Sequence, residues 1–150
     1  MPSVAVVDTN VVVSGLLTGD SDAPTRRILD AMLLGRFPFL LSIELLAEMR
    51  AVLLRPRIRV RHGLTHAEVD QILQAIAANG VIREPRYSGA AAPDPGDNHL
   101  WALLRVRPGS VLVTGDGALL EARPDWAEVM TPAVFVTLLE QQAGASRGGS

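Results

Sequence analysis

The sequence contains no cysteine and no lysine. Without cysteine the chain has neither a disulfide framework nor a thiolate nucleophile, and we expect a cytoplasmic protein. All 14 basic residues are arginine, which excludes any mechanism that requires a lysine. Aromatic residues make up only 4% of the chain, so the core must be built mainly from Val, Leu, Ile and Ala.

Long hydrophobic runs are absent as well. No apolar stretch reaches about 18 residues and no basic, then apolar leader begins at Met1, so we expect neither a membrane span nor a signal peptide. The net charge of −2 does not by itself indicate a nucleic-acid-binding protein. The 150 residues fit a single domain. We place this domain at residues 1–142 and expect the small, polar residues 143–150 to form a disordered tail.

Two short apolar segments each run into a carboxylate. Residues 4–7 (Val-Ala-Val-Val) precede Asp8, and residues 111–113 (Val-Leu-Val) precede a Thr-Gly-Asp segment that ends at Asp116. Both segments lack helical spacing, which predicts strands that are buried on both faces of a parallel sheet. Ligands of open α/β sheets bind beyond the carboxyl ends of the strands. Asp8 and Asp116 are therefore expected at one rim.

The rest of the chain alternates between helical and strand patterns. This alternation predicts an α/β fold, a three-layer α/β/α sandwich with a mostly parallel central sheet. We expect residues 55–62 to form a basic loop and residues 83–96 to form a long surface loop. Helices are expected near residues 10–17, 24–34, 43–55, 67–78, 97–107, 117–120 and 132–139, and further strands near residues 37–41, 81–82 and 128–130.

Two further carboxylates can join this rim. Asp97 begins a helix just before the second strand, and Glu48 lies in the helix that Ser42 caps. Clustered carboxylates repel one another unless a cation neutralises them, and hard oxygen ligands select Mg²⁺ or Mn²⁺. Such ions can activate water against a phosphodiester. Glu44 lies one helical turn before Glu48, so spacing alone does not choose between them.

Each acidic residue also has an ordinary structural interpretation. Asp8 and Asp97 can cap helices, Asp116 can lie in a turn, and Glu48 can be a solvated helical residue. His99 follows Asp97 by two positions, but a lone histidine beside Trp101 is more often structural, and we leave it unassigned. The basic run could contact an RNA backbone, or could be a solvated helix end. Its members are Arg50, Arg55, Arg57, Arg59 and Arg61.

In order along the chain, these segments resemble a PIN domain. The resemblance rests on Val-Asp-Thr-Asn at residues 7–10, Glu48 followed by Leu-Arg-Pro at 54–56, Asp-Pro-Gly-Asp-Asn at 94–98 and Thr-Gly-Asp at 114–116. It extends from residue 4 to about residue 139. The sequence is most similar to the bacterial VapC-like branch, whose members are toxins of toxin–antitoxin pairs.

The resemblance implies an endoribonuclease that depends on Mg²⁺ or Mn²⁺. It favours Glu48 over Glu44, and it implies that Asn10 and Thr114 line the site by hydrogen bonding. It also implies a homodimer and a small antitoxin partner that covers the site. Gly96 and the Gly-Ala pair at 117–118 depart from the branch's usual polar residues, but neither replaces a matched ligand. The residues that match the four acidic ligands are Asp8, Glu48, Asp97 and Asp116.

Other enzymes that begin with a strand and an aspartate fit less well. A haloacid dehalogenase-type phosphatase needs a second acid where Asn10 stands, and it usually needs a lysine. A response-regulator receiver also requires a lysine. The alternative that stays open is a non-catalytic PIN-like module that binds RNA or a protein partner.

Overall fold

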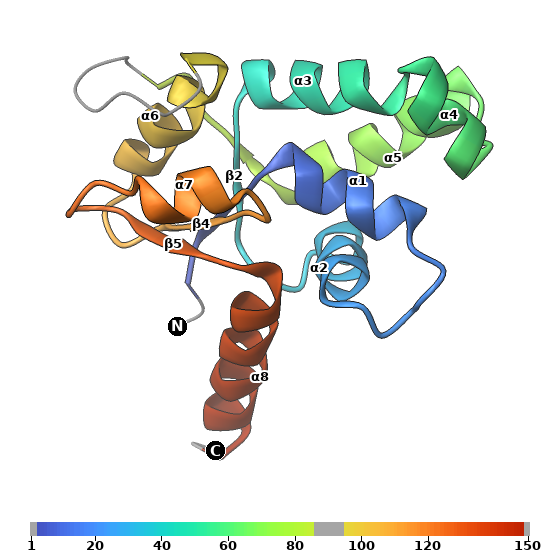
Figure 1. The fold of residues 1–150 in the computed structure, drawn as a ribbon. Helices are drawn as coiled ribbons and strands as arrows, with labels where there is room; N and C mark the ends of the chain where they lie inside the picture. Colours follow the sequence, from blue (N-terminus) through green and yellow to red (C-terminus); the bar gives the residue numbers. More distant parts are fainter. Residues whose placement is uncertain (1–2, 86–94, 149–150) are drawn as a thin grey trace.

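The computed structural model describes residues 3–85 and 95–148 (Figure 1). Part of the predicted surface loop, residues 86–94, therefore lies outside the described residues. The elements are β1 (Ala5–Val7), α1 (Thr9–Leu17), α2 (Pro24–Leu33), β2 (Leu40–Leu41), α3 (Ile43–Leu53), α4 (Pro56–His62), α5 (His66–Asn79), β3 (Val81–Ile82), a 3₁₀ turn (Pro95–Asp97), α6 (Asn98–Val106), β4 (Val111–Val113), α7 (Gly117–Glu121), β5 (Glu128–Met130) and α8 (Pro132–Gly148).

All strand pairings among the described residues are parallel. β1 pairs with β4, and β4 pairs with β5 on its other edge. β2 pairs with β3, and a parallel bridge between Ala5 and Phe39 connects this pair to β1. The strands therefore follow the order β3-β2-β1-β4-β5. The predicted α/β class with a parallel central sheet is confirmed.

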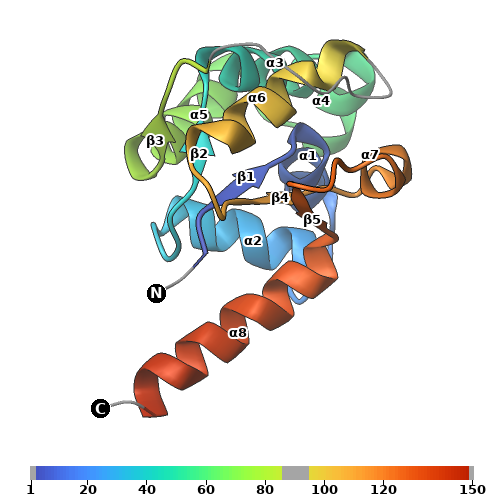
Figure 2. The ribbon, with the colours of Figure 1, turned by 90° about the vertical axis from the view of Figure 1, so that its left-hand side faces the viewer.

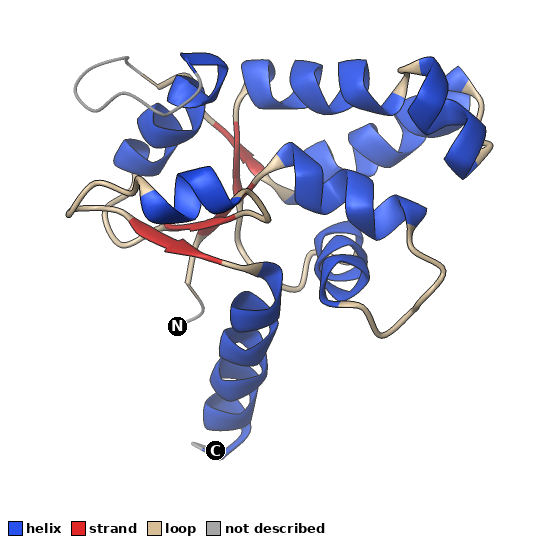
Figure 3. Ribbon diagram, viewed as in Figure 1, coloured by secondary structure: helices blue, strands red, loops and turns tan. Residues whose placement is uncertain are grey.

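Helices cover both faces of the sheet. In Figure 2, α6 lies on one side of β1 and β4, and α2 and α8 lie on the other side. Short strands are surrounded by longer helices throughout the fold (Figure 3). All residues of β1 and β4 are buried, because neither face of these strands meets solvent. This burial explains why both segments are continuously apolar rather than alternating.

Two predicted helix starts are confirmed by their capping contacts. The hydroxyl of Ser42 accepts a 3.0 Å hydrogen bond from the Leu45 amide at the start of α3. Thr65 and Glu68 form a reciprocal capping box at the start of α5. Such caps typically contribute about 1 kcal/mol each. They fix where α3 begins, and thereby the position of Glu48 along it.

The arginine-rich segment is a helix, not the predicted loop. α4 spans Pro56–His62, with proline at its first position, where no amide hydrogen bond is lost. Arginine is a good helix former, and Gly63 ends the helix with a positive φ of 68°. The alternation of arginine with apolar residues concealed this helix, because it has no helical period.

Two other boundaries differ from the sequence prediction. Regular strand pairing covers only Leu40–Leu41 of the predicted segment 37–41. α8 extends to Gly148, whereas a disordered tail was expected from residue 143. Gly144 does not stop this helix, since one glycine costs only about 1 kcal/mol relative to alanine.

The apolar faces of helices α2 and α5 are buried inside the fold. Ile28, Leu29 and Met32 of α2 are buried, as are Val69, Leu73 and Ile76 of α5. These faces therefore belong to the core rather than to a free surface. Among the described residues, no helix is both long and apolar enough to cross a membrane.

Candidate functional site

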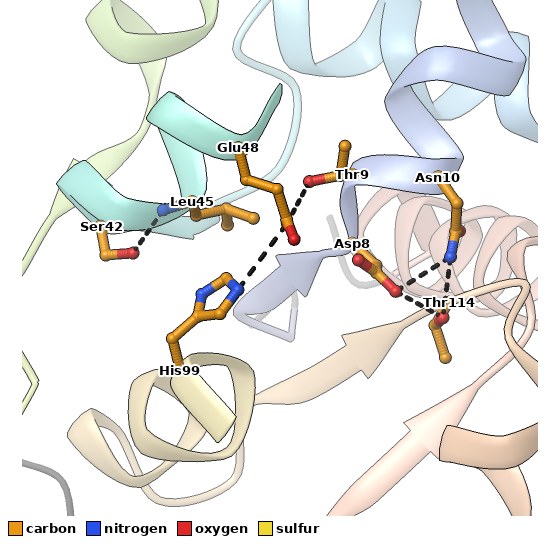
Figure 4. Close-up of polar contacts among 8 residues, drawn as sticks. All are labelled: Asp8, Thr9, Asn10, Ser42, Leu45, Glu48, His99 and Thr114. Atoms are coloured by element: carbon orange, nitrogen blue, oxygen red, sulfur yellow. Dashed lines mark hydrogen bonds and ion pairs between the residues drawn. The ribbon is translucent and has the colours of Figure 1, made fainter. Parts of the chain in front are cut away.

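Asp8 lies where β1 and β4 end together. Its amide donates a 2.9 Å hydrogen bond to the carbonyl of Val113, which continues the parallel pairing up to the rim. The side chain is only 5% exposed. Its Oδ2 accepts hydrogen bonds from the Thr114 hydroxyl at 2.8 Å and from the Asn10 amide at 3.0 Å (Figure 4). The carboxylate is therefore held in one orientation.

Asn10 and Thr114 extend this network to the neighbouring loop. The side-chain oxygen of Asn10 accepts from the Gly115 amide at 3.1 Å, and the hydroxyl of Thr114 accepts from the Asp116 amide at 3.0 Å. Asn10 also lines the cleft described below. Thr114 is fully buried and is not among the residues that line the cleft, and it takes part in the site through its hydrogen bond to Asp8.

The environment of Asp8 disfavours its charged form. Burial raises the pKa of this carboxyl group above 3.8, and the hydrogen bond from Thr114 only partly opposes that shift. The negative charges of Glu48 and Asp116 raise the pKa further. A buried carboxylate among like charges is stabilised by a nearby cation.

Glu48 reaches the rim from α3. The hydroxyl of Thr9 donates a 2.6 Å hydrogen bond to its Oε2 atom. The Nε2 atom of His99 lies 3.7 Å from the same oxygen (Figure 4). Glu48 lines the cleft, whereas Glu44 is not among the lining residues. The geometry thus favours the same glutamate that the resemblance favours.

Asp97 and Asp116 approach the rim from two loop-to-helix junctions. Asp97 is the last residue of the 3₁₀ turn, directly before α6, and makes no side-chain capping hydrogen bond. Asp116 caps α7, because its Oδ1 accepts a 2.9 Å hydrogen bond from the Ala118 amide. The sequence suggests a turn as the ordinary structural role of Asp116, whereas in the structure it caps a helix and also lines the cleft.

One cleft of about 670 Å³ brings the predicted acidic residues together. Its walls come from α1, α3, α4 and the ends of β1 and β4, and they carry both carboxylates and arginines. The polar and charged residues that line it include Asp8, Asn10, Glu48, Asp97, Asp116, Arg55 and Arg61. Four carboxylates line this one cleft, and oxygen is the ligand type that Mg²⁺ and Mn²⁺ prefer. Among the described residues, the group whose ligand atoms lie close enough to share one ion is Glu48, Asp97 and His99.

The five predicted RNA-contacting arginines are not equivalent. Arg55 and Arg61 line the acidic cleft. Arg50 instead forms an ion pair with Asp70 of α5, with 2.8 Å between Nε and Oδ1. Arg59 lines a separate small depression, and Arg57 is not among the cleft residues. The structure therefore separates two arginines that line the cleft from three that do not.

Sequence reasoning missed two residues of this site. Thr9 directly follows Asp8, and that adjacency is the signal that could have identified it. The sequence pattern assigns no role to His99, yet ligand atoms of Glu48, Asp97 and His99 all lie within 4.8 Å of one another. Asp97 and His99 are two positions apart in the sequence, across the junction between the 3₁₀ turn and α6.

Comparison with known families agrees with this geometry. The family model of the PIN domain matches residues 4–118. The matched span includes all four carboxylates that line the cleft. No curated protein matches the sequence.

Proposed function

We propose, from the premise that this chain belongs to the PIN domain family, that it is a metal-dependent endoribonuclease. PIN domains are generally metal-dependent nucleases that act on RNA. The observation that carries the proposal is the convergence of four carboxylates on one cleft. The proposed catalytic and metal-binding residues are Asp8, Glu48, Asp97 and Asp116.

These four residues would hold Mg²⁺ or Mn²⁺ within the cleft. Asp8 and Asp116 approach from the strand ends, and Glu48 and Asp97 approach from α3 and the start of α6. When bound, such an ion supplies charge for a phosphodiester oxygen and lowers the pKa of a water molecule. The fold has no lysine to perform either task.

The chain's own residues hold the carboxylates and the substrate. Thr114 and Asn10 fix the orientation of Asp8, and Thr9 fixes that of Glu48. Arg55 and Arg61 would bind phosphates of an RNA strand that lies along the cleft, since guanidinium groups pair with phosphate in a bidentate manner. The arginines thereby bring a polyanion to a site whose other charges repel it.

Within this family we assign the chain to the toxin role of a toxin–antitoxin pair. The support is the ordered set of motifs, together with an open acidic cleft that a small antitoxin could cover. The assignment carries with it a homodimer, a cytoplasmic location and one nuclease domain at residues 1–142. Induced expression in a bacterial host tests it: wild type should arrest growth, and Asp8→Asn should not. Equal growth of the two strains at equal protein levels would contradict the toxin role.

A cleavage assay tests the nuclease itself. Purified protein is incubated with a panel of single-stranded RNAs in Mn²⁺, in Mg²⁺ and in EDTA. We expect cleavage in a divalent metal, none in EDTA and none by Asp8→Asn. Asp70→Asn is the matched control, because it makes the same change in an exposed ion pair away from the cleft. Metal-dependent RNA binding without cleavage would favour the non-catalytic module instead.

A further inference from the structure

His99 occupies an unusual position for a structural histidine. It lies on the first turn of α6, and its side chain is 2% exposed. Among the described residues, its Nδ1 atom has no hydrogen-bond partner. Its Nε2 atom lies 3.7 Å from Oε2 of Glu48, which is too long for a hydrogen bond. Burial of a ring nitrogen without a partner, as for Nδ1, is costly.

The ligand atoms of Glu48, Asp97 and His99 are spaced closely enough to bind a single cation. Around an octahedral ion with bonds of about 2.1–2.2 Å, adjacent ligand atoms lie about 3 Å apart and opposite ones about 4.4 Å apart. The 3.7 Å between His99 and Glu48 lies between these two spacings, so the two atoms are close enough to share one ion. Asp97 completes the group, with all three ligand atoms within 4.8 Å of one another. Figure 4 shows the imidazole of His99 directed at the Glu48 carboxylate.

The donor chemistry of this position differs from that of the rest of the cleft. Mg²⁺ is bound almost wholly by oxygen, whereas imidazole nitrogen favours first-row transition metals. A cation bound here would also give the buried imidazole a partner for its Nε2 atom. Asp8 and Asp116, by contrast, offer only oxygen.

We propose that Nε2 of His99 is a direct ligand of a divalent ion held by Glu48 and Asp97, and that this nitrogen makes the position select a transition metal such as Mn²⁺ over Mg²⁺. The inference rests on the proposed metal-dependent function and specifies one ligand of its site. It assigns His99 a role beyond the four carboxylates.

Pulsed electron paramagnetic resonance of Mn²⁺ bound to the protein tests the proposal, because it detects directly coordinated nitrogen. Wild type should show a ¹⁴N coupling, and labelling all histidines with ¹⁵N should change it. This readout needs no variant and therefore does not depend on how a substitution folds. His66→Ala should keep the coupling, since His66 is exposed at the start of α5.

Affinity measurements add a second readout. His99→Ala should bind Mn²⁺ about 10- to 100-fold more weakly, while its Mg²⁺ affinity should change far less. Its unfolding temperature in EDTA establishes whether the variant is folded. Mn²⁺ binding that is lost in Asp8→Asn but shows no nitrogen coupling would overturn the role of His99 and leave the carboxylate site intact. Absence of any Mn²⁺ binding to wild type would overturn both.

Discussion

The hydroxyl of Thr9 donates a 2.6 Å hydrogen bond to Glu48, a residue 39 positions away on another helix. Thr9 begins α1 directly after Asp8, so the contact connects the end of β1 with α3. One hydrogen bond thereby sets the position of one proposed metal ligand relative to another. The cleft depends on such supporting contacts as much as on its carboxylates.

Removal of that hydroxyl should weaken metal binding. Thr9→Val keeps the shape of the side chain but leaves Glu48 without its donor. Loss of such a supporting contact typically costs about 10- to 100-fold in metal affinity, which calorimetric titration with Mn²⁺ measures. Thr9→Ser retains the hydroxyl and is the control. Equal Mn²⁺ affinities for the valine and serine variants would contradict this role.

Asp8→Asn should stabilise the metal-free protein at neutral pH. Folding raises the pKa of Asp8, so the charged carboxylate destabilises the folded protein. This destabilisation is absent below pH 3.8, the pKa of the unfolded chain, and is complete above the pKa of the folded protein. An asparagine oxygen can still accept from Thr114 and Asn10. We expect an increase in Tm of about 2–4 °C in EDTA, the shift that about 1 kcal/mol causes in a domain of this size.

The gain from Asp8→Asn should shrink as the pH falls toward 3.8, because wild-type Asp8 then takes up its proton. Thermal unfolding of both proteins across this range measures the effect. A lower Tm for Asp8→Asn at neutral pH would show that the carboxylate stabilises the fold without metal.

Arg55 and Arg61 should contribute to RNA binding more than Arg59 does. The first two line the acidic cleft, and Arg59 does not. In the Asp8→Asn background, Arg55→Gln or Arg61→Gln should weaken binding of single-stranded RNA and lower the salt slope by about 0.7 per lost phosphate contact. Fluorescence anisotropy at several salt concentrations measures both quantities. An equal effect of Arg59→Gln would point to a diffuse electrostatic surface.

Two glycines in helices should respond in opposite directions to alanine. A Cβ at Gly15 would lie 2.6 Å from the carbonyl oxygen of Thr25, where α1 packs against α2. Gly15→Ala should therefore lower the free energy of unfolding by about 1–3 kcal/mol. A Cβ at Gly144 meets nothing within 4 Å, and Gly144→Ala should raise it by up to about 1 kcal/mol. Urea denaturation measures both, and a stable Gly15→Ala would refute the close packing of α1 on α2.

The sequence predicted the parallel α/β fold because the relevant signals are local. The apolar runs before Asp8 and Asp116 are buried strands, and Ser42 and Thr65 cap helices as their positions suggested. Parallel topology then places both strand ends at one rim. The family match covers residues 4–118, which include both strands and both capped helix starts.

Other features depend on packing that no local pattern reveals. Arg50 pairs with Asp70 only because α3 lies against α5. His99 approaches Glu48 because α6 packs beside α3. Likewise, the direction of the Thr114 side chain follows from the pairing of β4 with β1, which could not be fixed before the sheet order was known.

Calorimetric titration of Mn²⁺ into wild type and Asp8→Asn decides whether these carboxylates form a metal site. We expect saturable binding to wild type and at least tenfold weaker binding to the variant, since Asp8 is the most buried of the four carboxylates. The unfolding temperature of Asp8→Asn verifies that it is folded. Equal binding by the two proteins, or no binding by wild type, would contradict a metal site built from these residues.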